Sequence, residues 1–169
     1  MIKYVPKMTN VVLEEIPDKL TLAVDISNCT GLCEGCHSPF LRCDVGDELT
    51  PSAVDSLISD NFGVNCFLFL GEGNDHKALM DIAAYIRRRY PHLELGLYSG
   101  RESVEDDIWL LFDYVKIGPY RPSCGPLNKR TTNQRLYKVT RNPDGAVSSE
   151  DITSRFWRKG IDPSLNESH

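Results

Sequence analysis

The sequence predicts an α/β protein with the architecture of a shortened, open (β/α) partial barrel. Strand-like apolar runs alternate with amphipathic helical segments, and this alternation requires right-handed crossovers and a mostly parallel sheet. The chain has 169 residues, of which 41% are hydrophobic, so it suits one domain with a real core. Because a closed (β/α)8 barrel takes about 250 residues, only part of such a barrel fits. We expect a single domain over residues 1–160 and a flexible tail over residues 161–169.

The first expected elements are two strands, over residues 11–17 and 20–26, which are rich in β-branched and apolar residues. A helix is expected next, because Thr50 can cap its N-terminus and Pro51 suits its first position. The apolar run over residues 64–70 then predicts a short strand. The alternation of strands and helices begins with these elements.

The middle of the chain continues the alternation. Asp75 is expected to begin a helix that Pro91 ends, and the arginine run over residues 87–89 suits the negative end of its dipole. This run is therefore explained better by a helix C-terminus than by nucleic-acid binding. Leucines alternate over residues 93–97 as in a strand, and Ser103 with the acidic run behind it predicts the start of a further helix.

The last expected elements are a strand over residues 112–117, a loop over 118–134 and a strand near 135–140. The loop is rich in Gly, Pro and Asn and lacks periodicity, and loops of this length in compact domains are often functional. The Pro-Asp-Gly sequence at 143–145 predicts a turn. A final helix, capped by Ser148 or Ser149, is expected to close the domain.

Charge and hydropathy argue against several classes of protein. The 19 Lys and Arg residues against 24 Asp and Glu residues leave a net charge of −5, which argues against a nucleic-acid-binding face built on bulk positive charge. The longest apolar run, residues 66–70, is far shorter than the roughly 20 residues that span a bilayer, and the N-terminus lacks the apolar core of a signal peptide. We therefore expect a cytoplasmic protein with no membrane or nucleic-acid partner.

A cluster of cysteines carries most of the chemical information. Cys29, Cys33 and Cys36 form a C-x3-C-x2-C motif directly after the strand expected to end at Ile26. In a chain without an export signal, clustered cysteines bind metal or do redox chemistry more often than they form a disulfide framework. The other cysteines lack ligand spacing and are expected not to bind metal: Cys43, Cys66 and Cys124.

The motif is compatible with four chemistries. Residues 33–37 match the C-x-x-C-H signature of c-type haem attachment, which normally occurs outside the cytoplasm. Cys33 and Cys36 could form a thioredoxin-like pair, which leaves Cys29 unexplained. The three cysteines and His37 could hold zinc, but the neighbours Cys36 and His37 would have to turn onto one ion. Three thiolates can also hold a 4Fe-4S cluster with one iron open to an outside ligand, and the spacing and placement fit this best.

Two segments carry a resemblance to a known family. The C-x3-C-x2-C motif after the first barrel strand resembles the radical S-adenosylmethionine (radical SAM) superfamily. Within it, Cys33-x-Gly35-Cys36-His37 and the Thr-Thr-Asn-Gln-Arg segment at 131–135 resemble the anaerobic ribonucleoside-triphosphate reductase activating proteins, over nearly the whole chain. The resemblance implies a partial barrel of the radical SAM type and an oxidoreductase that activates a glycyl-radical enzyme.

The resemblance also implies the cofactors and partners. The open iron of a single 4Fe-4S cluster binds S-adenosyl-L-methionine, which one electron splits into methionine and a 5′-deoxyadenosyl radical. This radical removes a hydrogen atom from a glycine of the partner, the glycyl-radical subunit of anaerobic ribonucleoside-triphosphate reductase. The transfer is downhill because the glycyl radical is delocalised over both flanking amides. A flavodoxin or ferredoxin is implied as the electron donor.

The resemblance finally implies the site residues. Cys29, Cys33 and Cys36 are the metal ligands and the catalytic centre. The positions around the cofactor are Gly35, Cys36, His37, Gly71, Glu72, Gly73, Ser99, Lys116 and Asn133. Gly71 and Gly73 would let the backbone approach the methionine ammonium group, although Glu72 stands where glycine is usual. Structural roles stay open, since residues 71–73 suit an ordinary turn, His37 a polar loop, and Asn133 a loop cap.

Two other functions fit the same residues. One is a radical SAM activase for a different glycyl-radical enzyme, such as one that acts on pyruvate or a choline-like substrate. The other, from a different class, is a small iron–sulfur electron carrier or a zinc module without catalysis. Cleavage of S-adenosylmethionine separates the enzymes from the carrier.

Overall fold

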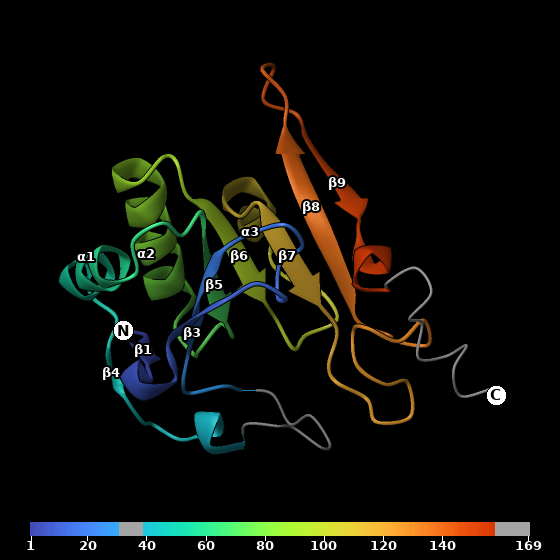
Figure 1. Cartoon of the computed structure of the whole chain (residues 1–169), viewed down its shortest axis with the longest axis horizontal. Helices are drawn as coiled ribbons and strands as arrows, with labels where there is room; N and C mark the ends of the chain where they lie inside the picture. Colours follow the sequence, from blue (N-terminus) through green and yellow to red (C-terminus); the bar gives the residue numbers. More distant parts are fainter. Residues whose placement is uncertain (31–38, 158–169) are drawn as a thin grey trace.

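The computed structural model describes residues 1–30 and 39–157, which form a mixed α/β fold around one large sheet (Figure 1). The strands are β1 (Lys3–Tyr4), β2 (Asn10–Val12), β3 (Thr21–Asp25), β4 (Asp47–Glu48), β5 (Cys66–Leu70), β6 (Glu94–Tyr98), β7 (Tyr114–Ile117), β8 (Arg135–Arg141) and β9 (Val147–Asp151). The α-helices are α1 (Pro51–Asp60), α2 (His76–Arg89) and α3 (Asp106–Leu111). Short 3-10 turns form η1 (Pro6–Met8), η2 (Pro39–Arg42) and η3 (Thr153–Phe156).

The large sheet has the strand order β2-β3-β5-β6-β7-β8-β9. Its centre is parallel, because β3, β5, β6 and β7 pair successively in the same direction and α1, α2 and α3 supply the crossovers. The outer strands β2, β8 and β9 pair antiparallel. In the described residues β2 and β9 lie at opposite edges and do not pair, so the sheet is not closed into a barrel. A separate pair, β1 with β4, lies beside it.

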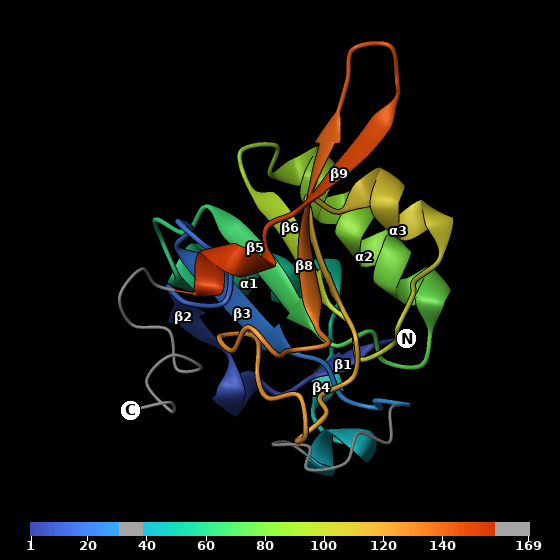
Figure 2. The same cartoon turned by 90° about the vertical axis from the view of Figure 1, so that its right-hand side faces the viewer.

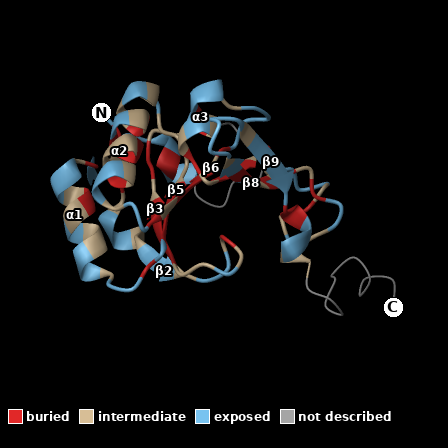
Figure 3. Cartoon of the chain, turned by 90° about the horizontal axis from the view of Figure 1, so that it is seen from above, coloured by how far each residue is buried: buried red, intermediate tan, exposed pale blue. Residues whose placement is uncertain are grey.

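The main core lies between the sheet and the helices. The sheet curves, with the helices on one side of it, which we call the outer face (Figure 3). Phe69 of β5 packs edge-on against Phe112, with ring centroids 5.8 Å apart. The helices contribute fully or nearly fully buried apolar side chains to this core: Val54, Leu79, Ile82, Ala83, Ile86 and Ile108. Their burial holds the crossovers against the sheet and so positions the loops at the carboxyl ends of the parallel strands.

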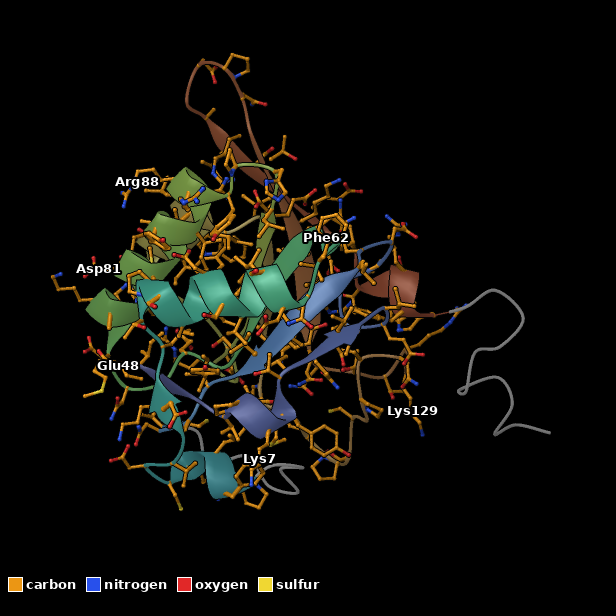
Figure 4. The ribbon with its side chains drawn as sticks, turned by 60° about the vertical axis from the view of Figure 1, so that its left-hand side comes forward. Lys7, Glu48, Phe62, Asp81, Arg88 and Lys129 are labelled. Carbon is orange, nitrogen blue, oxygen red and sulfur yellow. The ribbon has the colours of Figure 1, made fainter. Side chains whose placement is uncertain are left out.

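Local capping explains where the two longer helices begin. The side chain of Thr50 accepts a hydrogen bond from the Ala53 N–H at 3.1 Å, and Asp75 accepts one from the Ala78 N–H at 3.1 Å. Both N-caps were predicted from sequence and are confirmed. On the solvent side of α2, Asp81 and Arg88 project away from the core (Figure 4).

The prediction of a helix after the 143–145 turn is wrong. Residues Val147–Asp151 form β9, in which Ser148 pairs with Thr140 and Ser149 with Val139 of β8. The turn was predicted correctly, and it joins a hairpin that extends beyond the rest of the sheet (Figure 2). A serine side chain can cap a helix by hydrogen bonding to the backbone, which is why a helix was expected. Here the exposed edge of β8 offers hydrogen-bond partners to the backbone of residues 147–151, so these residues form a strand instead.

Two further boundaries differ from expectation. The helix α3 begins after Glu105 and not at Ser103, and the Glu105 side chain makes no cap because Arg101 binds its carboxylate. The strand predicted over residues 11–17 ends at Val12. Residues 13–18 instead turn beneath the sheet, where Ile16 is fully buried and Asp18 has a positive φ of 64°. Burial of Ile16 against the sheet therefore ends the strand.

The opposite face of the sheet, which we call the inner face, carries a smaller apolar cluster. Ala23, Leu68 and Leu136 belong to it, and Ile16 packs over them. Gly96 makes room for this packing, because a Cβ there would lie 3.0 Å from Leu68 Cδ1 and 3.5 Å from Ile16 Cδ1. Ile16 and the apolar side chains beneath it cover only part of the inner face. Space therefore remains toward the carboxyl ends of the strands.

Among the described residues, none of the helices has the length and apolar character needed to cross a membrane. The tail expected over residues 161–169 lies outside the described residues.

Candidate functional site

The loop that carries the cysteine motif starts at the carboxyl end of β3. Its first residues are fixed by backbone hydrogen bonds to the returning chain: Asn28 N–H to Cys43 O at 3.2 Å and Cys29 N–H to Leu41 O at 2.8 Å. The Ser27 hydroxyl adds a bond to Val45 O at 2.6 Å. These contacts hold both ends of the loop together at the carboxyl edge. Gly35 and the remaining motif residues lie outside the described residues: Cys33, Cys36 and His37.

The turn at residues 71–73 lies directly beside the start of this loop. Gly71 has a φ of +114° and Gly73 a φ of +68°, and both values strain any residue with a side chain. A Cβ at Gly73 would lie 3.2 Å from Ile26 Cγ2 and 3.5 Å from Ser27 O. Backbone conformation alone therefore accounts for both glycines, and it brings this turn against the base of the cysteine loop.

Replacement of Gly73 by Ala tests whether the turn also binds a ligand. We expect the free energy of unfolding to fall by about 1–2 kcal/mol, because the positive φ disfavours a side chain and Ile26 must yield. Gly63→Ala is a matched control, since Gly63 has a φ of +96° with open space around its Cβ. If the turn holds S-adenosylmethionine, the Kd measured by equilibrium dialysis rises about tenfold for Gly73→Ala and is unchanged for Gly63→Ala. An unchanged Kd in a folded Gly73→Ala variant assigns the turn a structural role only.

Glu72 points into a network of side chains at the same edge. Arg101 donates to it through Nη2 at 2.6 Å and Nε at 3.0 Å, and the buried Ser99 hydroxyl donates to it as well. The same guanidinium binds Glu105 and, with a backbone hydrogen bond, lowers the pKa of the Glu105 carboxyl to about 2. Glu72 thus ties the loop after β5 to the loop after β6, and its side chain is only 16% exposed.

This network answers the question that the sequence left open for Glu72. Its carboxylate is engaged by Arg101, and the Ser99 hydroxyl donates to Glu72 and accepts from the Arg101 N–H at 3.1 Å. Arg101 was not predicted from the sequence. A signal was present, because Arg101 precedes Glu105 by four residues and follows a strand that neighbours the one before Glu72.

Lys116 lies on the inner face near the end of β7. It is 7% exposed, and its Nζ lies 5.4 Å from the centroid of the Tyr98 ring, a cation–π contact. Both residues line a cavity of about 800 Å³, the inner pocket, together with residues from the segment 13–18, the loop 118–134 and η3. Of the predicted cofactor-binding residues that the structure describes, Lys116 is the one that lines it.

Asn133 lies where the 118–134 loop returns to the sheet. Its Nδ2 donates to Pro119 O at 2.9 Å, which is the loop-holding role that the sequence left open. Its Oδ1 is buried and accepts no hydrogen bond from the described residues. An unpaired buried acceptor is unfavourable, which leaves Asn133 suited to a donor from a ligand. Gln134 follows it, and its Nε2 donates to Gly118 O at 3.3 Å.

The cysteines outside the motif occupy different environments. Cys66 is fully buried in β5, and burial raises the pKa of its thiol to about 12, so it stays protonated and behaves as a small apolar residue, as predicted. Cys43 is exposed near the base of the cysteine loop, and Cys124 is partly exposed in the loop 118–134. Among the described residues no group of three or more His, Cys, Asp or Glu side chains could hold a metal ion.

The carboxyl edge of the parallel strands brings several predicted residues together. Backbone hydrogen bonds connect the loops in series: Gly71 N–H to Tyr98 O at 3.0 Å, Ser99 N–H to Lys116 O at 2.8 Å, and Gly118 N–H to Arg101 O at 2.6 Å. Cys29, the 71–73 turn, Ser99, Lys116 and Asn133 thus follow one another along this edge. No family model, curated protein or solved structure matches the chain.

Proposed function

We propose that this protein is a radical SAM activase that generates a glycyl radical on an anaerobic ribonucleoside-triphosphate reductase. The observation that carries the proposal is the position of the C-x3-C-x2-C motif. Cys29 follows the carboxyl end of β3, the first of the parallel strands, and loops at this edge are where α/β proteins bind ligands. The glycine turn after β5 lies beside it.

The cysteine residues suit an iron–sulfur cluster. Cys29 is partly exposed, and its backbone is fixed by the bond to Leu41 O, so its thiolate can reach a metal centre at low cost in entropy. Cys29, Cys33 and Cys36 would hold the cluster, and three thiolates leave one iron open to an outside ligand. When bound, the 4Fe-4S cluster supplies the electron that cleaves S-adenosylmethionine.

The cofactor-binding residues are proposed on the same edge. The buried, unpaired Oδ1 of Asn133 suits one of the N–H or O–H donors that S-adenosylmethionine carries. Gly71 and Gly73 would present backbone groups to its methionine portion. Ser99 and Glu72 act through the network with Arg101, which positions the glycine turn. Gly35, Cys36 and His37 lie outside the described residues and stay predictions.

The open sheet supports a macromolecular substrate. Because β2 and β9 do not pair in the described residues, the inner face is accessible from the side through the inner pocket. A flexible glycine segment of another protein could enter there. The proposed electron donor is a flavodoxin or ferredoxin, since cleavage of the cofactor needs a low-potential electron.

The activity is tested by anaerobic reconstitution with iron and sulfide, followed by incubation with S-adenosylmethionine, dithionite and the reductase from the same cell. We expect methionine and 5′-deoxyadenosine to form, and a doublet glycyl signal to appear in the electron paramagnetic resonance spectrum of the reductase. The signal should be absent when the reductase glycine is replaced by Ala. A cluster-containing protein that never cleaves S-adenosylmethionine would instead support the electron carrier.

A second outcome separates the two activases. If cleavage is rapid but the reductase shows no signal, while a pyruvate- or choline-type glycyl-radical enzyme is activated by the same preparation, the partner is the other enzyme. Zinc as the only metal bound after reconstitution would contradict both activases and support the zinc module.

A further inference from the structure

The large sheet ends at β9, and one side of this strand has no neighbouring strand among the described residues. Figure 1 shows β9 at the opposite end of the sheet from β2, with no described helix or strand beyond it. Val147 is half-buried, and the residues that follow it in the strand are exposed. An edge strand of this kind presents backbone N–H and C=O groups to which another strand can add.

The pairing of β9 with β8 decides which of its backbone groups face this free edge. Val139 of β8 lies opposite Ser149, but the Val139 N–H donates to Asp113 O, on the other side of β8, at 2.7 Å. Bonded and non-bonded pairs alternate along antiparallel strands, so residues 147, 149 and 151 turn their N–H and C=O groups away from β8. No other described part of the chain forms a backbone hydrogen bond with these groups.

The free groups of β9 are complementary to themselves under a two-fold rotation about Ser149. In an antiparallel pair of two β9 strands centred there, the N–H of Ser149 meets the C=O of Ser149 in the second copy. Val147 of each copy likewise meets Asp151 of the other. Because both copies use the same surface in such a contact, the assembly closes at two chains.

The charges of β9 favour one orientation and one register of the second copy. The antiparallel pair puts Glu150 opposite Ser148 of the second copy, whose hydroxyl can donate to the carboxylate, and puts Asp151 opposite Val147. Within each copy Lys138 of β8 lies opposite Glu150 and offsets its charge. A parallel pair in register, or an antiparallel pair centred on Asp151, would instead set like charges directly side by side. The strand is therefore complementary in charge to a second copy of itself.

We propose that two copies of this chain associate by antiparallel pairing of their β9 strands about a two-fold axis at Ser149, so that the two large sheets become continuous. The contact does not involve the cysteine motif and does not depend on the proposed activity. Because a pair of five-residue strands buries less area than a standard protein interface, we expect a weak dimer that exchanges with the monomer.

Sedimentation velocity of the full chain measures the association directly. We expect the average mass to rise from the 19.1 kDa of one chain toward twice that value as the protein concentration is raised to about 100 μM. A chain that stays monomeric over the whole range would overturn the inference.

Charged variants test the position of the two-fold axis. Ser149→Glu and Ser149→Lys each place two like charges directly opposite one another, on Cα atoms about 5.5 Å apart, and should raise the dimer Kd about fivefold. An equimolar mixture of the two variants should restore the dimer, because Glu then faces Lys. Ser52→Glu and Ser52→Lys are the matched controls, since Ser52 is an exposed serine of α1, far along the sheet from β9 (Figure 1). They should leave the Kd unchanged.

Ser149→Pro tests the backbone hydrogen bonds themselves. Proline removes the N–H that faces the free edge and removes none of the bonds between β9 and β8, so the variant should fold and show no dimer. Circular dichroism and urea unfolding check the fold, and the charged variants carry the test if this one unfolds. A dimer that persists in all three Ser149 variants would place the interface elsewhere and overturn the inference. A mixture of the Glu and Lys variants that associates no better than either alone would also overturn it.

Discussion

Replacement of Cys29, Cys33 or Cys36 by Ala is expected to abolish the iron–sulfur cluster and, with it, all cleavage of S-adenosylmethionine. A cluster held by three thiolates loses one of its ligands, and among the described residues no group of three or more His, Cys, Asp or Glu side chains could hold the metal instead. Iron and sulfide content and the absorbance at about 400 nm measure the loss after anaerobic reconstitution.

The other three cysteines are the controls for this experiment. Cys66→Ala should keep the cluster, because its buried, protonated thiol lies within β5. Cys124→Ala should keep it too, since Cys124 lies in the loop 118–134. Cys43→Ala is the most demanding control, because the Cys43 carbonyl accepts a hydrogen bond from Asn28 next to the motif. Loss of iron in any of these three variants would contradict the ligand assignment.

Asp113→Ala is expected to lower the free energy of unfolding by about 3 kcal/mol. Asp113 lies before β7 with 17% of its side chain exposed, and its carboxylate accepts from Arg87 at 2.8 Å, Arg141 at 2.9 Å and the Leu95 N–H at 2.8 Å. Removing it leaves a backbone donor unpaired and two guanidinium groups without their counter-ion. Urea unfolding followed by circular dichroism measures the change.

A double-mutant cycle shows whether the loss of stability comes from the contacts of the Asp113 carboxylate. Arg141→Ala should cost less than Asp113→Ala, because Arg87 and the Leu95 N–H keep their hydrogen bonds to Asp113. The two changes together should cost less than their sum, since they remove one interaction. Asp60→Ala is the matched control on the exposed C-terminal end of α1 and should change stability little. Additive losses would show that Asp113 acts through some other contact.

The contacts of the Asp113 carboxylate also connect the fold to the candidate site. Arg87 extends from α2, Leu95 belongs to β6, and Arg141 ends β8, so one carboxylate joins α2 to the centre and to the antiparallel end of the sheet. The register of β8 against β7 sets where Gln134 and Asn133 meet Gly118 and Pro119. A change at Asp113 should therefore loosen the pocket wall before it affects the cysteine loop.

Local sequence determined the two longer helices and the parallel strands. Thr50 and Asp75 cap α1 and α2 as predicted, because a side-chain oxygen at the N-cap acts within three residues of itself. The apolar runs that form β5 and β6 are buried on both faces of the sheet, as their hydrophobicity alone predicts. The sequence also determined the spacing of Cys29, Cys33 and Cys36, from which the proposed chemistry follows.

Only the tertiary structure decided the features that depend on partners distant in sequence. Ser148 lies in a strand because β8 offers backbone partners, and residues 13–18 leave the sheet because Ile16 is buried on the inner face. The Glu72–Arg101 pair joins residues 29 positions apart, and the inner pocket joins segments that range from Leu13 to Phe156. Propensity acts over a few neighbouring residues, whereas pairing, burial and ion pairing depend on which segments the whole fold brings within reach.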